Sequence, residues 1–306
     1  MQISRRDFVR QATLASSIVV THGSGASAWD HARLAGTQTP QAGALPLRIG
    51  MTDWNLGKRG DVTKVALARQ IGLDGIQVSL TFPTDNSPHL REPKTQAEFK
   101  QAALENGIQI CSLAIGSPGK ARLPLHTNPA AAILLVEAVD VARNLGTNNI
   151  LLPILGDSHI HMENQQEVDT FVAMMKEVAR YAEKAGVVVA LEDWISADDN
   201  LRLLDAIGSD FVGVYYDARN IKSRVHDPYG EPKKLGKRIN QVHIKNGPKL
   251  MRETDILDWP RLAQEYYDIE YRGWYVLETD APSKDLIADT RDNIEYVRKT
   301  FKMPAA

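Results

Sequence analysis

A strand-then-helix alternation repeats eight times from residue 47 onward and constrains the fold more than any other feature of the chain. Short apolar runs predict the strands, at 47–51, 75–79, 108–113, 149–153, 187–191, 212–216, 241–245 and 274–277. Helical patterns follow at 62–71, 96–105, 130–145, 165–184, 200–207, 259–267 and 286–301, and one short piece is expected near 234–238. Successive strands start roughly 30 residues apart, which is the length of a βαβ unit.

Eight such units predict an α/β protein with a single domain, a (β/α)8 TIM barrel over residues 47–306. The strands are continuous apolar runs, as in parallel sheets covered by helices. Five glycines closely follow helical patterns, where a left-handed residue is needed to end a helix; they are Gly72, Gly107, Gly146, Gly186 and Gly208. A doubly wound open sheet is the alternative, but no Gly-x-Gly-x-x-Gly follows any of the strands.

The first 28 residues have the three parts of a twin-arginine signal peptide. Arg5 and Arg6 form the twin arginine, residues 12–20 are apolar, and Ala26-Ser-Ala28 has the small residues that signal peptidase reads. An amphipathic first helix is the alternative. We expect export to the periplasm, a flexible lead-in at 29–46, and no stable membrane anchor, because the apolar run is too short to span a bilayer.

Composition excludes two other classes of partner and site. The formal net charge is −2, without the basic excess that nucleic-acid-binding proteins carry. Cys111 is the single cysteine, so neither an intrachain disulfide nor a thiolate metal cluster can form. The sequence leaves open whether the protein forms a homo-oligomer.

Four polar residues lie at the ends of the last four expected strands. Glu192 follows 187–191, Asp217 follows 212–216, and Glu278 follows 274–277, while His243 lies within 241–245. The carboxyl ends of barrel strands form the catalytic face. Clustered carboxylates repel one another unless a cation neutralises them, so we expect one divalent cation here: Mn²⁺, Mg²⁺, Co²⁺ or Zn²⁺. Taken singly, Glu192 can instead cap a helix, and His243 can be a hydrogen-bonded core residue.

Other residues of the same face are candidates for substrate contacts. Lys245 shares the inward face of His243, and a buried lysine needs a partner. Trp54 and Trp194 follow the first and fifth strands and can form apolar walls for a sugar ring, although core packing explains each of them nearly as well. His159 and His161 follow the fourth strand, where a polar surface loop is the alternative.

Glu192, the Asp217-Ala-Arg-Asn220 turn, the His243-Ile-Lys-Asn246 strand and Leu277-Glu278 resemble the sugar phosphate isomerase/epimerase family of xylose isomerase-like TIM barrels. The resemblance covers residues 47–301. It implies one divalent ion on Glu192, Asp217, His243 and Glu278. It also implies that the two glutamates carry protons on opposite faces of the substrate.

The chain departs from this pattern at two positions that bear on substrate contacts. Asn220 stands where some members that act on free ketoses have histidine, and Asn246 stands where the motif often ends in aspartate. The related DNA-repair endonucleases hold three zinc ions with extra histidines, and Asn220 replaces one of those candidates.

These features predict a metal-dependent sugar isomerase or epimerase. The expected reaction moves a proton beside a carbonyl through an enediolate, with one glutamate as base and the other as acid. Two alternatives stay open: a metal-dependent lyase or hydrolase acting on oxidised (keto) sugars or glycosides, and a non-catalytic periplasmic sugar-binding barrel. No Gly-rich loop or Arg cluster marks a phosphate site near the last two strands, which favours a non-phosphorylated carbohydrate.

Overall fold

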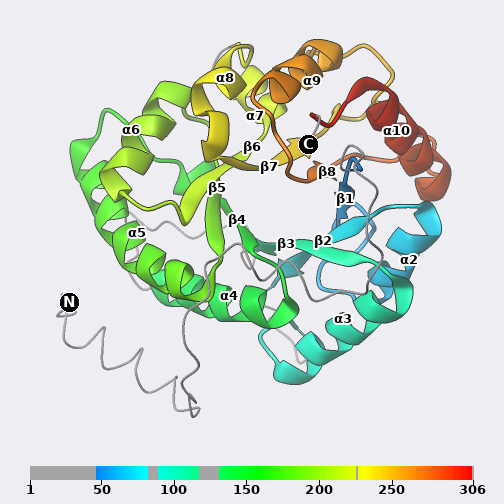
Figure 1. Ribbon diagram of the computed structural model, residues 1–306, viewed down its shortest axis with the longest axis horizontal. Helices are drawn as coiled ribbons and strands as arrows, with labels where there is room; N and C mark the ends of the chain where they lie inside the picture. The colour runs from blue at the N-terminus through cyan, green and yellow to red at the C-terminus, as the bar shows by residue number, and fades with distance from the viewer. Residues whose placement is uncertain (1–45, 82–88, 117–130, 225–226, 305–306) are drawn as a thin grey trace. The chain divides into compact units, whose positions relative to one another are not determined.

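Eight parallel strands close into a barrel, in chain order from β1 to β8 (Figure 1). The computed structural model describes residues 46–81, 89–116, 131–224 and 227–304. The strands are β1 (Ile49–Thr52), β2 (Gly75–Leu80), β3 (Gln109–Ile115), β4 (Asn149–Pro153), β5 (Val188–Glu192), β6 (Val212–Tyr216), β7 (Ile239–Ile244) and β8 (Tyr275–Leu277). Pairing of Ile49 with Tyr275 between β1 and β8 closes the ring. The predicted single-domain TIM barrel is confirmed, whereas the signal peptide at 1–28 and residues 29–45 of the lead-in lie outside the described residues.

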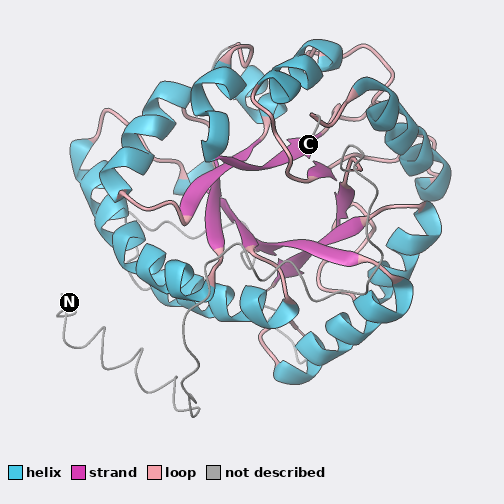
Figure 2. Ribbon diagram, in the orientation of Figure 1, coloured by secondary structure: helices cyan, strands magenta, loops and turns pink. Residues whose placement is uncertain are grey.

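Helices surround the barrel and cover the outer face of its strands (Figure 2). They are α2 (Thr63–Ile71), α3 (Pro93–Asn106), α4 (Ala131–Leu145), α5 (Gln165–Ala185), α6 (Ala197–Ile207), α7 (Ala218–Arg224), α8 (Glu231–Leu235), α9 (Trp259–Asp268) and α10 (Leu286–Thr300). All five predicted glycines have positive φ, between 62° and 102°, as left-handed helix ends require. None of the helices in the described ranges is long and apolar enough to cross a membrane.

The sixth crossover is more elaborate than the sequence predicts. One short helix was expected near 234–238, but the structure has α7, α8 and a 3-10 turn, η3 (Gly236–Arg238). Gly230, at φ 87°, precedes α8, and Pro232 lies in its first turn, where the missing N–H costs nothing. Residues 227–230 therefore lie between two helices, and α7 begins just after the end of β6.

A cluster of buried, mostly apolar side chains fills part of the barrel interior. Cys111, Trp274 and Val276 pack there with Leu151 and Ala190. The space is filled so tightly that a Cβ on Gly75 would lie 2.7 Å from the Trp274 ring. This packed layer is a rigid floor for the polar side chains nearer the carboxyl ends of the strands.

Candidate metal centre

Glu192, Asp217, His243 and Glu278 converge at the carboxyl ends of β5 to β8. Glu192 ends β5, Asp217 follows β6, His243 lies in β7 and Glu278 follows β8. One ligand atom from each lies within 4.8 Å of those of the other three. His243 Nδ1 is 3.2 Å from Glu192 Oε1, 3.8 Å from Asp217 Oδ2 and 3.4 Å from Glu278 Oε2. The structure thus brings together all four residues that the sequence predicts as ligands.

Lys245 lies beside this cluster, just beyond β7. Its ammonium nitrogen is 2.8 Å from Glu278 Oε2 and 2.7 Å from Asp217 Oδ2. Burial alone would lower the pKa of Lys245, but the Asp217 and Glu278 carboxylates more than offset it and raise that pKa above its ordinary value. Lys245 therefore stays charged and offsets part of the negative charge of the three carboxylates.

The carboxylates also perturb the other titrating groups of the cluster. Burial, helped by the nearby Glu192 and Glu278 charges, raises the pKa of Asp217 although Lys245 acts against it. Burial alone would lower the pKa of His243, but Glu278 and Glu192 raise it further than burial lowers it. The Glu192 and Glu278 charges act in the same direction on both groups, because negative charge favours positive or protonated forms of its neighbours.

The hydrogen bonds around the carboxylates fit a divalent cation. Asp217 Oδ1 accepts the backbone N–H groups of Arg219 and Asn220, which caps α7. Its buried Oδ2 accepts no hydrogen bond in the described part of the chain, since Lys245 approaches it without hydrogen-bond geometry. The contact between Lys245 and Asp217 Oδ2 is therefore an ion pair, because a hydrogen bond also requires alignment of donor and acceptor.

The two glutamates are each held at Oε1. Asn220 Nδ2 donates to Glu192 Oε1 at 3.0 Å, and Trp54 Nε1 donates to Glu278 Oε1 at 3.1 Å. Carboxylate oxygens with one imidazole nitrogen suit a hard or borderline divalent ion. Asn220 and Trp54, both predicted as substrate contacts, thus orient two of the candidate ligands in this structure.

The capping role that the sequence allows for Glu192 is taken by another residue. Ser196 caps α6 by accepting the N–H of Asp199.

Asp193 is buried beside Glu192, and its Oδ1 accepts hydrogen bonds from Ile195 N and Asn200 Nδ2. Burial raises the pKa of Asp193 to about 7. Sequence reasoning passed over Asp193, since an acid beside a strand-end glutamate resembles a loop residue.

His159, His161 and Trp194 form a separate group on the rim, together with Arg224. The His159 ring lies 5.1 Å from His161 and 5.9 Å from Trp194, and Arg224 Cζ lies 4.8 Å from the Trp194 ring. His161 Nδ1 also contacts Glu167 Oε2 at 3.0 Å.

Trp54 lies nearer the candidate metal centre. Its ring centre is 6.2 Å from that of His243, and Arg59 Cζ lies 4.2 Å from the centre of the Trp54 ring.

Two residues that contact His243 were missed by the sequence analysis. Gln77 Oε1 lies 3.1 Å from His243 Nε2, and the Tyr215 ring centre lies 4.5 Å from the imidazole. A polar residue inside the expected strand at 75–79 was the available signal for Gln77, because every second side chain of a barrel strand faces inward.

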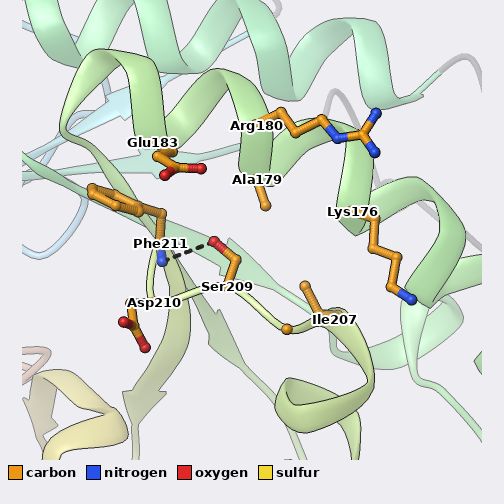
Figure 3. Close-up of a pocket in the computed structure, with 9 residues that line it drawn as sticks. Lys176, Ala179, Arg180, Glu183, Ile207, Ser209, Asp210 and Phe211 are labelled. Atoms are coloured by element: carbon orange, nitrogen blue, oxygen red, sulfur yellow. Dashed lines mark hydrogen bonds between the residues drawn. The ribbon is translucent and has the colours of Figure 1, made fainter.

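A cavity of about 450 Å³ lies elsewhere, between α5 and the loop that leads into β6 (Figure 3). Lys176 and Arg180 come from α5, and Ser209 and Asp210 come from the loop. This loop enters the amino end of β6, whereas the four candidate ligands lie at the carboxyl ends. The cavity is therefore not part of the candidate site.

A comparison with protein families matches residues 65–300 to the model for the xylose isomerase-like TIM barrel. The search of curated proteins gave no significant match. A solved D-psicose 3-epimerase superposes with a TM-score of 0.69 at 14% identity, covering 83% of this chain and 99% of that one. A 3-keto-D-glucoside 4-epimerase from E. coli gives 0.68 at 15% identity, covering 83% and 100%. A sugar phosphate isomerase/epimerase from Parabacteroides distasonis gives 0.65 at 15% identity, covering 87% and 98%.

Proposed function

The chain belongs to the xylose isomerase-like TIM barrel family, and we propose that it is a divalent-metal-dependent sugar isomerase or epimerase. The observation that carries the proposal is the convergence of three carboxylates and one imidazole within 4.8 Å at the catalytic face. One divalent ion together with the Lys245 ammonium balances the three carboxylates, which is a physical reason for this cluster to exist.

Glu192, Asp217, His243 and Glu278 are the residues that would hold the ion. When bound, it supplies a Lewis acid that makes the C–H beside a sugar carbonyl more acidic. Glu278 then removes or returns a proton at that carbon, with Trp54 holding its other oxygen. Glu192, held by Asn220, carries the proton on the other face of the substrate.

The solved neighbours support this type of reaction while differing in substrate. One acts on the ketohexose D-psicose and another on a 3-keto-D-glucoside, and in each case the stereocentre that is epimerised lies next to a carbonyl. Proton transfer beside a carbonyl is therefore the step we assign here. A lyase shares this first step and differs only in that a leaving group then departs. A purely sugar-binding barrel gives no reason for two glutamates, each oriented by its own donor.

Metal content and turnover test the proposal together. Protein purified without chelator should contain about one equivalent of divalent metal, as one set of four ligands implies. The metal-loaded enzyme should interconvert a free ketohexose or a 3-keto-D-glucoside with its epimer, and EDTA should stop this. Three equivalents of zinc, or metal retained in His243→Ala, would contradict the proposed centre.

We also propose export through the twin-arginine route, on the basis of residues 1–28. Receptor-read signals depend on the exact residues of the pair. Replacing Arg5 and Arg6 together by lysine should retain the full-length protein in the cytoplasm. Unchanged export of the double variant through that route would show the assignment to be wrong.

A further inference from the structure

We propose that Gln77 is the positioning residue that keeps the His243 imidazole protonated on Nε2, so that Nδ1 is the atom that binds the divalent cation. The inference rests on the metal centre proposed above. It assigns a role in metal binding to a residue of β2, a strand that carries none of the four candidate ligands.

The two ring nitrogens of His243 face different surroundings. Nε2 lies 3.1 Å from Gln77 Oε1, an uncharged amide oxygen on a fully buried side chain. Nδ1 faces the carboxylates of Glu192, Asp217 and Glu278 at 3.2, 3.8 and 3.4 Å. Only Nδ1 can share an ion with these three oxygens, and it can do so only when the ring proton is on Nε2.

The orientation of the Gln77 amide is fixed by two hydroxyl groups. Its Nε2 donates to Ser112 Oγ at 2.8 Å and to Tyr215 Oη at 3.0 Å, which uses both amide hydrogens. The amide oxygen is then left to accept the N–H of His243. A flipped amide would donate to the imidazole and move the ring proton to Nδ1, where it would occupy the place of the ion.

Tyr215, one of these two hydroxyl-bearing residues, also restrains the plane of the His243 imidazole. The Tyr215 ring lies 4.5 Å from that of His243, at an angle of 60°. Ser112, Gln77 and Tyr215 are all buried, so water does not compete for these hydrogen bonds. Orienting partners of this kind change metal affinity by about 10–100-fold when they are removed from metal-binding histidines.

Gln241 offers a matched control within the same barrel. It is also a buried glutamine, it lies two residues before His243 on β7, and its amide donates to Cys111 O at 2.6 Å. Gln77→Met and Gln241→Met make the same change in size and polarity. A general effect of core packing would therefore act on both variants, whereas loss of the His243 partner would act on Gln77→Met alone.

The experiment measures Mn²⁺ binding to the full-length protein by titration calorimetry. We expect the Kd of Gln77→Met to rise about 10–100-fold, and that of Gln241→Met to stay within about threefold of wild type. Tyr215→Phe, which removes one of the two amide anchors but keeps the ring, should weaken Mn²⁺ binding several-fold. This second variant decides the question if Gln77→Met does not fold.

Nitrogen-15 NMR of histidine-labelled, Zn²⁺-loaded protein gives a direct view of the tautomer. Wild type should show the His243 proton on Nε2, identified by comparison with His243→Ala, and Gln77→Met should show a mixture of tautomers. A proton on Nδ1 in Zn²⁺-loaded wild type would overturn the inference.

Each outcome of the titration has a distinct meaning. Unchanged Mn²⁺ affinity in Gln77→Met, or an equal loss of affinity in Gln241→Met, would show that Gln77 does not have this role. Neither result would contradict the proposed metal centre. Wild type that binds neither Mn²⁺ nor Zn²⁺ would instead remove the metal centre, and the role of Gln77 with it.

Discussion

At the scale of single residues, the proposed function gives Glu278 two roles that one substitution can separate. Its Oε2 faces His243 and Lys245, while its Oε1 accepts the Trp54 N–H. Glu278→Gln keeps an oxygen that can coordinate weakly but loses the ability to accept a proton. At saturating metal we expect an intact fold and bound ion, with turnover reduced by at least about a hundredfold, the usual scale of a general base.

Steady-state kinetics and metal analysis of Glu278→Gln check this expectation. Glu295→Gln, which removes a charge from the exposed face of α10, is the control and should leave turnover unchanged. Full activity of metal-saturated Glu278→Gln would place the proton carrier elsewhere, and Lys245 would be the next residue to replace.

Asp193 makes a separate prediction about pH and stability. Burial raises its pKa to about 7 from an ordinary value of 3.8. An acid whose pKa is raised on folding stabilises the protein fully below the lower value, and this contribution is lost as pH rises toward the higher one. Metal-free wild type should therefore lose stability, relative to Asp193→Asn, between about pH 4 and pH 7.

Thermal unfolding across this pH range measures the effect. One pKa unit corresponds to about 1.4 kcal/mol, and 1 kcal/mol shifts the Tm of a domain this large by about 2–4 °C. We expect the Tm of Asp193→Asn to gain several degrees on wild type over the range. The Tm of Asp210→Asn, a substitution at an almost fully exposed position, should change with pH in the same way as that of wild type. Parallel curves for Asp193→Asn would show that Asp193 is ionised throughout.

At the scale of elements, the start of β2 depends on the absence of a side chain at residue 75. A Cβ there would lie 2.7 and 2.8 Å from two atoms of the Trp274 ring and 3.0 Å from Gln109 O. Gly75→Ala should cost about 1–3 kcal/mol, as overpacking of a filled core does. Because both ring atoms belong to the outer edge of the indole, Trp274→Phe should relieve part of the strain.

Urea unfolding of the two single variants and the double variant measures this coupling. We expect the double variant to be more stable than the sum of the single effects predicts, because the two side chains compete for one space. Strictly additive effects would mean that Gly75 is required for the backbone rather than for packing.

The elements themselves were largely predictable from the sequence, because their signals are local. Apolar runs and positive-φ glycines placed all eight strands and seven of the helices within a few residues. The division of the sixth crossover into α7 and α8 was missed, because short helices around prolines carry little periodicity. The four candidate ligands were found by one rule of the fold, that strand ends meet at one face.

Contacts between residues that lie far apart in the chain could not be predicted from the sequence. Gln77 and His243 are 166 positions apart, and their hydrogen bond depends on barrel closure and register. The bonds from Asn220 to Glu192 and from Trp54 to Glu278 likewise join different loops. Sequence reasoning could identify these residues as polar or aromatic groups at the catalytic face, but not which partner each would take.

At the scale of the whole molecule, the closed barrel gathers side chains from β2, β5, β6, β7 and β8 around one point. An apolar layer fills the interior below it. Rigid strands fix the carboxylates, while the loops at the same face bear Trp54, Trp194 and the two rim histidines. This arrangement suits an enzyme that must hold a sugar still between two proton-transferring groups.

Exchange of hydrogen with solvent tests the proton-transfer account most directly. The metal-loaded enzyme is incubated in D₂O with the sugar that it interconverts, and NMR follows deuterium at the carbon beside the carbonyl. The account predicts deuterium at that carbon in wild type, suppression by EDTA, and loss of net conversion in Glu278→Gln. Because Glu192 is intact in that variant, exchange on one face can persist. Conversion by wild type without any deuterium incorporation at that carbon would contradict the account.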